Sequence, residues 1–417
     1  PHYPGNSPEH LLQNAVLEWG QNVKDLDWFS IPPDGWTTEN YINPRNGLPM
    51  FRALRTASDI AGVVEDWLDP AGPVATPVAM LLSEASDTWE VGGLGQGAVA
   101  PGSEPSNAFQ EERKNTYFAL RNAGYRVDLM TEADVREGYL KPYKVLYAGG
   151  ENMERATAKV IAGWVNDGGI LYASAGAARK DEYDEPLDVL DDVVGRGKRV
   201  SYVRYKGALR SKLELPLLKP LDSVTPTEGG RIDTLATQEK FAAGKDAVVL
   251  ATYGDGSPAM VTKKTGKGAG YYIGTMPGEA WAQKALPVMP CGKGGPENNT
   301  RYPQFEPTDF DPAAAAVILR PLQDAKIRPD IRADKPNVVC NRLAGQAGTV
   351  ITIVNLGGTQ KGAVKDLTLA IDDAAKAARV WSYAYPKDLG HEVKDGVLLV
   401  HLPEVNLVDV LVLEGVQ

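Results

Sequence analysis

The chain has 417 residues, 43% of them hydrophobic and 24% charged, which is the composition of a globular protein with two or three domains. Its net charge of −10 argues against nucleic acid and anionic membrane surfaces as partners, because both are themselves negative. No stretch approaches the roughly 18 apolar residues that a membrane-spanning helix needs, and a neutral ligand such as a sugar requires no electrostatic attraction.

The N-terminal region predicts a helix, a strand, a loop and a second helix. Residues 8–20 have helical spacing of apolar side chains, residues 26–31 are typical of a short aromatic strand, and residues 48–68 predict a long amphipathic helix. The chain starts at Pro1 and shows no signal peptide. We therefore expect a processed or truncated piece, and the sequence assigns no cellular compartment.

Strands and helices alternate after a linker at residues 69–77 that is rich in Pro and Gly. Such alternation implies crossover connections and a parallel sheet covered on both faces. Residues 247–278 instead predict antiparallel strands that turn at Asp255-Gly256 and again at 266–268. The strands expected in the alternating part are 78–84, 125–132, 143–150 and 168–176, and the helices are 107–124 and 154–167.

The last ~90 residues alternate at period two, which predicts a small antiparallel β-sandwich. A poorly periodic tract, rich in Pro and Gly, precedes them. These differences in sequence pattern divide the chain into four parts: the helix, strand, loop and helix region at 1–69, the α/β domain at 70–290, an irregular linker at 291–325, and the sandwich at 326–417.

Ser174 ends a predicted strand at the place where many α/β enzymes carry a nucleophile. The elbow motif GxSxG fails here, because Tyr172 replaces the first glycine. A serine nucleophile also needs an imidazole or an equivalent base. The chain has four histidines, none inside the α/β region: His2, His10, His391 and His401. The sequence favours a tight turn at Ser174, and a nucleophile served by His391 or His401 is the alternative.

Two glycine-rich segments resemble phosphate-binding loops but lack the required context. Gly266–Gly270 precedes a strand rather than a helix, and no helix opens directly after Gly92–Gly97. We interpret the first as a hairpin turn and the second as a surface loop. Cys291 and Cys340 show no CxxC spacing and the acidic runs lack the calcium-loop pattern, so we expect neither a metal nor a cofactor.

The loop after the predicted strand at 26–31 carries the richest chemistry of the chain. Aromatic rings cover the C–H face of a sugar, while carboxylate and amide groups bind its hydroxyls. The candidate substrate-binding residues are Trp28, Trp36, Glu39, Asn40 and Tyr41. The alternative is that the tryptophans close a barrel end and Glu39 caps a helix or forms an ion pair. A glycosidase needs two carboxyl groups at a defined separation, and no such pair is evident, so the catalytic residues are unassigned.

The order of these segments resembles the C-terminal half of a family 42 glycoside hydrolase of the β-galactosidase type. Residues 16–68 resemble the last helix, strand, loop and helix of the catalytic (β/α)8 barrel. Residues 115–176 together with 266–278 are similar to the trimerisation domain, itself a relative of class I glutamine amidotransferases. Residues 395–415 are like the small C-terminal β-domain.

The resemblance implies an α/β fold: a flavodoxin- or amidotransferase-like parallel sheet, preceded by the last β/α unit of a TIM barrel and followed by a small antiparallel β-sandwich. It implies an amidotransferase fold without the nucleophilic Cys, near whose position Ser174 lies. It also implies a homo-oligomer, a trimer, that acts in carbohydrate metabolism on a β-linked sugar. The catalytic glutamates belong to a missing N-terminal barrel portion or partner chain, and residues 36–41 then line the substrate cleft.

Two other functions stay open at this point. A non-catalytic assembly or carbohydrate-binding protein with a degenerate amidotransferase-like domain explains the lack of a convincing nucleophile, base or metal cluster. An active amidotransferase or hydrolase that uses Ser174 is the third reading. The sugar, the linkage and the stereochemical outcome are not assigned by the sequence.

Overall fold

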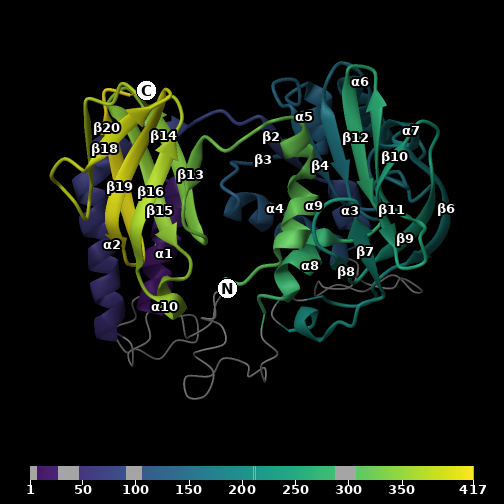
Figure 1. Ribbon diagram of the computed structural model, residues 1–417, viewed down its shortest axis with the longest axis horizontal. Helices are drawn as coiled ribbons and strands as arrows, with labels where there is room; N and C mark the ends of the chain where they lie inside the picture. The colour runs from purple at the N-terminus through teal and green to yellow at the C-terminus, as the bar shows by residue number, and fades with distance from the viewer. Residues whose placement is uncertain are drawn as a thin grey trace. The chain divides into compact units, whose positions relative to one another are not determined.

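The computed structural model describes residues 7–26, 47–90, 106–209, 211, 213–286 and 307–416. Two compact units divide the chain (Figure 1). Unit 1 consists of residues 1–75, 289–308 and 329–417, and unit 2 of residues 76–288 and 309–328. The N-terminal helices therefore belong to the same unit as the C-terminal strands. Within the described ranges, no helix combines the length and the apolar character that crossing a membrane requires.

Unit 2 is built around a nine-stranded mixed sheet, where the sequence predicted a parallel one. The parallel strands, in spatial order, are β3 (Asp128–Thr131), β2 (Val78–Leu82), β4 (Val145–Ala148), β5 (Ile170–Ala173) and β12 (Gly268–Ile273). The sheet continues antiparallel through β11 (Pro258–Thr265), β10 (Val248–Tyr253), β7 (Asp222–Pro226) and β8 (Ile232–Thr234). The antiparallel hairpins predicted around Asp255 and Gly266 are confirmed, and they extend the parallel sheet because β12 pairs with β5.

Helices cover both faces of this sheet, which explains why β4 is buried along its whole length. Val145 and Tyr147 point into one core with Phe109, whereas Leu146 and Ala148 point into the other. The helices of unit 2 are α3 (Glu84–Glu90), α4 (Ala108–Asn122), α5 (Glu132–Glu137), α6 (Arg155–Asn166), α7 (Asp191–Val194), α8 (Pro277–Gln283) and α9 (Pro312–Asp324). Outside the large sheet, β6 (Arg196–Val203) pairs with β9 (Gln238–Ala243) as a separate two-stranded ribbon.

The irregular linker predicted at 291–325 contains helix α9. Asp311 caps the helix, because its side chain accepts hydrogen bonds from the backbone N–H groups of Ala313 and Ala314. Pro312 fits the first helical position, where its missing N–H is not needed. Val317 and Ile318 are among the residues that bury the helix in the core of unit 2. Residues 309–325 of this tract therefore belong to unit 2.

Unit 1 contains the predicted antiparallel sandwich. One sheet has the order β1 (Gly72–Pro73), β14 (Val338–Gly345), β15 (Gly348–Asn355), β20 (Val408–Glu414) and β17 (Arg379–Ser382). The other has the order β13 (Ile331–Ala333), β16 (Val364–Ile371), β19 (Val397–Val405) and β18 (His391–Lys394). Inward side chains such as Ile351 and Leu369 form the core between the sheets. A short helix, α10 (Gly358–Lys361), follows β15.

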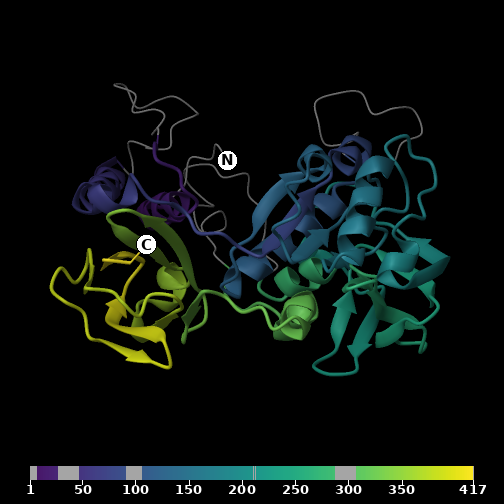
Figure 2. The ribbon, with the colours of Figure 1, turned by 90° about the horizontal axis from the view of Figure 1, so that it is seen from above.

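Helices α1 (Pro8–Gly20) and α2 (Gly47–Leu68) pack on the outer face of the five-stranded sheet (Figure 2). Trp19 and Ile60 from the helices contact side chains such as Val350 and Val412, so β15 is buried on both faces. A Cβ on Gly20 would lie 2.3 Å from Thr352 Oγ1, which shows how closely α1 approaches the sheet. The predicted helices at 8–20 and 48–68 are confirmed.

Candidate functional site

The turn that follows β5 at the carboxyl end of the parallel strands is the place where the sequence located a possible nucleophile. Ser174 is 3% exposed, and the next residues turn sharply because Gly176 and Ala178 both adopt left-handed backbone conformations. The backbone N–H of Gly176 donates to Tyr272 Oη at 2.9 Å, and that of Ala178 donates to the Gly150 carbonyl at 2.9 Å. The turn is thus fixed by β12 and by the loop after β4.

No described imidazole serves Ser174. His391 and His401 both belong to unit 1, where His391 Nδ1 lies 2.8 Å from the Leu389 carbonyl and His401 Nδ1 lies 3.2 Å from Thr368 Oγ1. A carboxyl group that could act as a base in place of an imidazole is that of Glu112, which lines the same small pocket as Ser174. Burial raises the pKa of Glu112 to about 8, so at neutral pH it carries a proton and cannot accept one.

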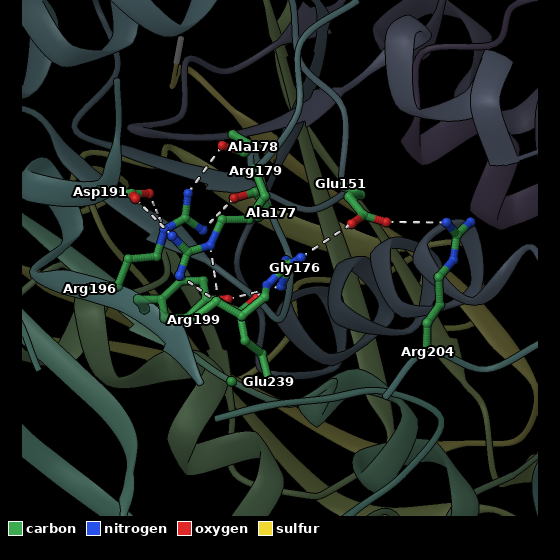
Figure 3. Close-up of polar contacts among 12 residues, drawn as sticks. Glu151, Gly176, Ala177, Ala178, Arg179, Asp191, Arg196, Arg199, Arg204 and Glu239 are labelled. Atoms are coloured by element: carbon green, nitrogen blue, oxygen red, sulfur yellow. Dashed lines mark hydrogen bonds and ion pairs between the residues drawn. The ribbon is translucent and has the colours of Figure 1, made fainter. Parts of the chain in front are cut away.

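Charged side chains gather beside this turn, and they include residues that the sequence did not single out (Figure 3). Arg196, whose side chain is 1% exposed, donates through Nε to Asp191 at 2.7 Å and through Nη2 to the Ala178 carbonyl at 3.1 Å. Arg179 binds the other oxygen of Asp191 at 2.7 Å. The two arginines therefore hold the turn after β5 against helix α7.

Glu239 on β9 is the most enclosed carboxylate of this cluster, with no exposed surface. Arg179 Nε donates to one of its oxygens and Arg199 Nη2 to the other, both at 3.0 Å. Burial alone would raise the pKa of Glu239, but the guanidinium groups of Arg179 and Arg199 outweigh burial and hold that pKa below its usual value. The carboxylate is consequently ionised and fully paired.

A second carboxylate extends the network on the side of β4. Glu151, in the loop after β4, accepts from Arg204 at 3.1 Å and lies 3.7 Å from Arg199. Arg199 also stacks over the ring of Tyr202, with its guanidinium carbon 4.0 Å from the ring centroid. We call the set of Arg179, Arg196, Arg199, Arg204, Glu151, Asp191 and Glu239 the arginine cluster.

The contacts of the arginine cluster indicate a structural role, because its charged groups bind one another and the backbone of the turn after β5. Its carboxylates are paired with guanidinium groups, and its arginines donate to carbonyls of the turn or to those carboxylates. The acidic run at 179–195 is partly buried: Asp181 is 5% exposed and is paired with Arg155 at 2.8 Å. Two arginines on β6, Arg196 and Arg199, were the available signal, but the partner of Arg199, Glu239, lies 40 residues away.

The predicted sugar-binding residues Trp28, Trp36, Glu39, Asn40 and Tyr41 lie outside the described residues. The glycine-rich segment 92–97 and Cys291 lie outside them too. Ser174 and the glycine-rich segment 266–270 are described, and both lie in unit 2. Among the described residues, no cluster of three or more His, Cys, Asp or Glu side chains has a geometry that could hold a metal.

Comparison with known families finds a likeness for the region that contains the arginine cluster. Residues 100–288 match the family model described as the β-galactosidase trimerisation domain. Over these residues unit 2 is similar to the trimerisation domain of β-galactosidases. This match covers the parallel strands β3, β4, β5 and β12, so the predicted resemblance to the C-terminal portion of a family 42-like glycoside hydrolase is confirmed. No curated protein matches the chain in sequence.

Solved structures share the fold across nearly the whole chain. The β-galactosidase from Bacillus circulans sp. alkalophilus has 15% identity and a TM-score of 0.64, and the alignment covers 97% of this chain and 52% of that one. The cold-adapted β-galactosidase from Rahnella sp. R3 has 17% identity, a TM-score of 0.61, and coverage of 98% and 52%. The α-L-fucosidase isoenzyme 2 from Paenibacillus thiaminolyticus has 12% identity, a TM-score of 0.61, and coverage of 98% and 57%.

The chain spans about half the length of these solved structures. At identities of 12 to 17%, the likeness establishes the fold alone. The antiparallel sheets of unit 1 and the mixed sheet of unit 2 both fall within the aligned region, because it includes 97% or more of the chain.

Proposed function

We propose that this chain is the C-terminal portion of a β-galactosidase-like glycoside hydrolase that hydrolyses a β-linked sugar. The observation that carries the proposal is the match of residues 100–288 to the trimerisation domain of β-galactosidases, together with a shared fold over nearly the whole chain. In this proposal the main catalytic carboxylates belong to an N-terminal barrel portion or a partner chain. The present chain contributes oligomerisation and one loop of the substrate cleft.

The loop is the one that carries Trp36, Glu39 and Tyr41, and residues 1–69 would be the end of the barrel. The aromatic rings would cover the apolar face of the sugar, and the carboxylate and amide groups would bind its hydroxyls. Replacing Trp36 or Tyr41 by Ala should weaken sugar binding by roughly 1 to 3 kcal/mol, the loss of one buried aromatic contact. Calorimetric titration of the assembled protein with galactose measures this effect, with the exposed Tyr139→Ala as the control.

We also propose a flavodoxin- and amidotransferase-like ancestry for unit 2. If its parallel strands are numbered along the chain, their spatial order is 2-1-3-4-5, which is the flavodoxin-type order. The carboxyl end of this sheet would normally hold a ligand or a nucleophile. In this chain the arginine cluster lies at the carboxyl end of the sheet, which supports a role of unit 2 in assembly rather than in hydrolysing glutamine.

The test of the main proposal is hydrolysis by the protein assembled with a family 42 barrel portion, or by the longer parent chain. Chromogenic β-D-galactosides are the first substrates, and α-L-fucosides and other glycosides complete the panel, since one similar structure is an α-L-fucosidase. Release of nitrophenol from a β-linked sugar supports the proposal. Inactivity of the complete assembly across the panel contradicts it.

A non-catalytic assembly or carbohydrate-binding protein is the second candidate. It is favoured by the paired state of the arginine cluster and by the absence of an imidazole among the described residues of unit 2. The same assembly separates the two candidates, because a protein that binds galactose without hydrolysing any glycoside fits only the second.

A further inference from the structure

Helices α4 and α8 meet at an unusually close contact inside unit 2. Glu112 on α4 is 1% exposed, and the backbone N–H of Glu279 on α8 donates to its Oε2 at 3.0 Å. Thr116 Oγ1 donates to the other oxygen of Glu112 at 3.1 Å. A Cβ on Gly278 would come within 2.8 Å of both the backbone and the carboxylate of Glu112, so only glycine permits this approach.

A second carboxyl group is buried at the same contact. Glu279 has no exposed surface, and its Oε2 accepts from Asn115 Nδ2 at 3.3 Å, while its Oε1 has no hydrogen-bond partner. Tyr172 on β5 lines the pocket next to Glu112, and its hydroxyl group also lacks a partner. Two carboxyl groups and one hydroxyl group are thus enclosed with fewer hydrogen bonds than they can make.

Among the described residues, no cation forms an ion pair with Glu112 or Glu279, although the charge of Lys114 opposes the rise in the pKa of Glu279. On α4, Lys114 is paired with Glu111, and Arg113 is paired with Asp87 at 2.8 Å. At the ends of α8 and α9, Lys284 is paired with Asp311. The strand β5 contributes only the neutral phenol of Tyr172.

The electrostatic setting of both carboxyl groups therefore disfavours ionisation. Burial raises the pKa of Glu112 to about 8, although the N–H groups of Gly278 and Glu279 and the hydroxyl of Thr116 oppose this rise. Burial, followed by the neighbouring charge of Glu112, raises the pKa of Glu279 well above its usual value. Two carboxylates in one low-dielectric site cannot both ionise cheaply.

We propose that Glu112 and Glu279 form a proton-dependent latch between α4 and α8, closed while the carboxyl groups carry protons and weakened when alkaline conditions remove them. The sign follows from proton linkage. In the unfolded chain both groups ionise near pH 4.5, whereas in the folded chain Glu112 holds its proton up to about pH 8. The latch contributes its full stability below pH 4.5, and this contribution falls as the pH rises from there towards 8.

The test is the unfolding equilibrium of the full chain in urea between pH 5.5 and 8, combined with hydrogen exchange of the α4 and α8 peptides. Each proton retained only by the folded state makes the unfolding constant rise by up to about tenfold per pH unit. The variants are Glu112→Gln and Glu279→Gln, which keep the shape and remove the titration. Glu137→Gln, at an exposed site on α5, is the matched control.

In either latch variant, we expect the unfolding constant to rise less steeply with pH than in the original chain, by a factor of up to about ten per pH unit. In Glu137→Gln the rise of the unfolding constant with pH should be unchanged. Exchange of the α8 amides, corrected for the intrinsic rate, should accelerate towards pH 8 in the original chain and accelerate less in either variant. If one variant fails to fold, the other carries the test. A latch variant with the original pH dependence, or an original chain with none, overturns the proposal.

Discussion

Unit 2 buries carboxyl groups in two opposite ways. Glu239 in the arginine cluster is paired with two guanidinium groups and stays ionised, whereas Glu112 and Glu279 form no ion pair with a described cation and stay protonated at neutral pH. The first arrangement lies beside the turn where a nucleophile was conceivable, and the second lies across the pocket that Ser174 lines. Neither arrangement offers a free base to Ser174, because Glu239 is fully paired with arginines and because Glu112 and Glu279 keep their protons.

The largest effect is expected from Arg179→Ala. This change leaves Glu239 buried with half of its compensation lost, and breaking a buried ion pair typically costs about 3 to 5 kcal/mol. Urea unfolding followed by circular dichroism measures the loss. Arg136→Ala is the control, since its pair with Glu154 at 2.9 Å is partly exposed and should cost less than about 1 kcal/mol. Equal costs in the two variants would show that the arginine cluster does not brace unit 2.

A smaller loss is expected from Glu239→Gln, and it should depend on pH. Neutral Gln loses the charge-assisted hydrogen bonds to Arg179 and Arg199, at a cost of about 1.5 to 3 kcal/mol at pH 7. Because the folded pKa of Glu239 is lowered, its contribution is complete above its unfolded value of 4.5 and is lost as the pH falls through the folded value. Unfolding free energies of the two proteins should therefore converge in acid. A gap that stays constant down to pH 3 would contradict this.

Glu90 is a third kind of buried carboxyl group in unit 2, since it accepts hydrogen bonds from the N-terminus of a helix. It accepts from the backbone N–H groups of Phe109 at 2.8 Å and Gln110 at 3.2 Å, yet burial raises its pKa to about 7. Glu90→Gln should cost about 1 kcal/mol below pH 4.5, the worth of a typical cap. The difference should shrink as the pH rises from 4.5 to 7, and thermal unfolding across this range checks it. A difference that grows instead would mean that Glu90 is stabilised as a carboxylate.

The smallest effect is expected from Ser174→Ala. Its hydroxyl group has no described base, so the change should alter the unfolding free energy by less than about 1 kcal/mol. Glycoside hydrolysis by the complete assembly and any glutaminase activity should be unaffected. A large fall in either activity, with stability unchanged, would restore Ser174 as a nucleophile.

The sequence predicted most of the elements that depend on local periodicity. The helices at 8–20 and 154–167, the hairpin turn at Asp255-Gly256 and the alternating C-terminal strands are all confirmed. Helix α9 was missed, because its flanking prolines and glycines obscured the Asp311-Pro312 start signal. The five-stranded sheet and its covering helices come from the two ends of the chain, a long-range contact that periodicity does not encode.

The candidate site was harder to predict for the same physical reason. Arg179 and Glu239 are separated by 60 residues, and only the pairing of β6 with β9 beside the β5 turn brings them together. Glu112 and Glu279 are separated by 167 residues. Isolated acidic residues on amphipathic helices are normally solvated, so nothing local marks these two as buried. The aromatic loop at 28–41 stays a prediction.

Sedimentation equilibrium of the chain at micromolar concentration tests the central claim, that unit 2 serves assembly rather than catalysis. We predict a species of roughly three times the 44.9 kDa chain mass, because residues 100–288 are similar to a trimerisation domain. A strictly monomeric species of 44.9 kDa at these concentrations would contradict it.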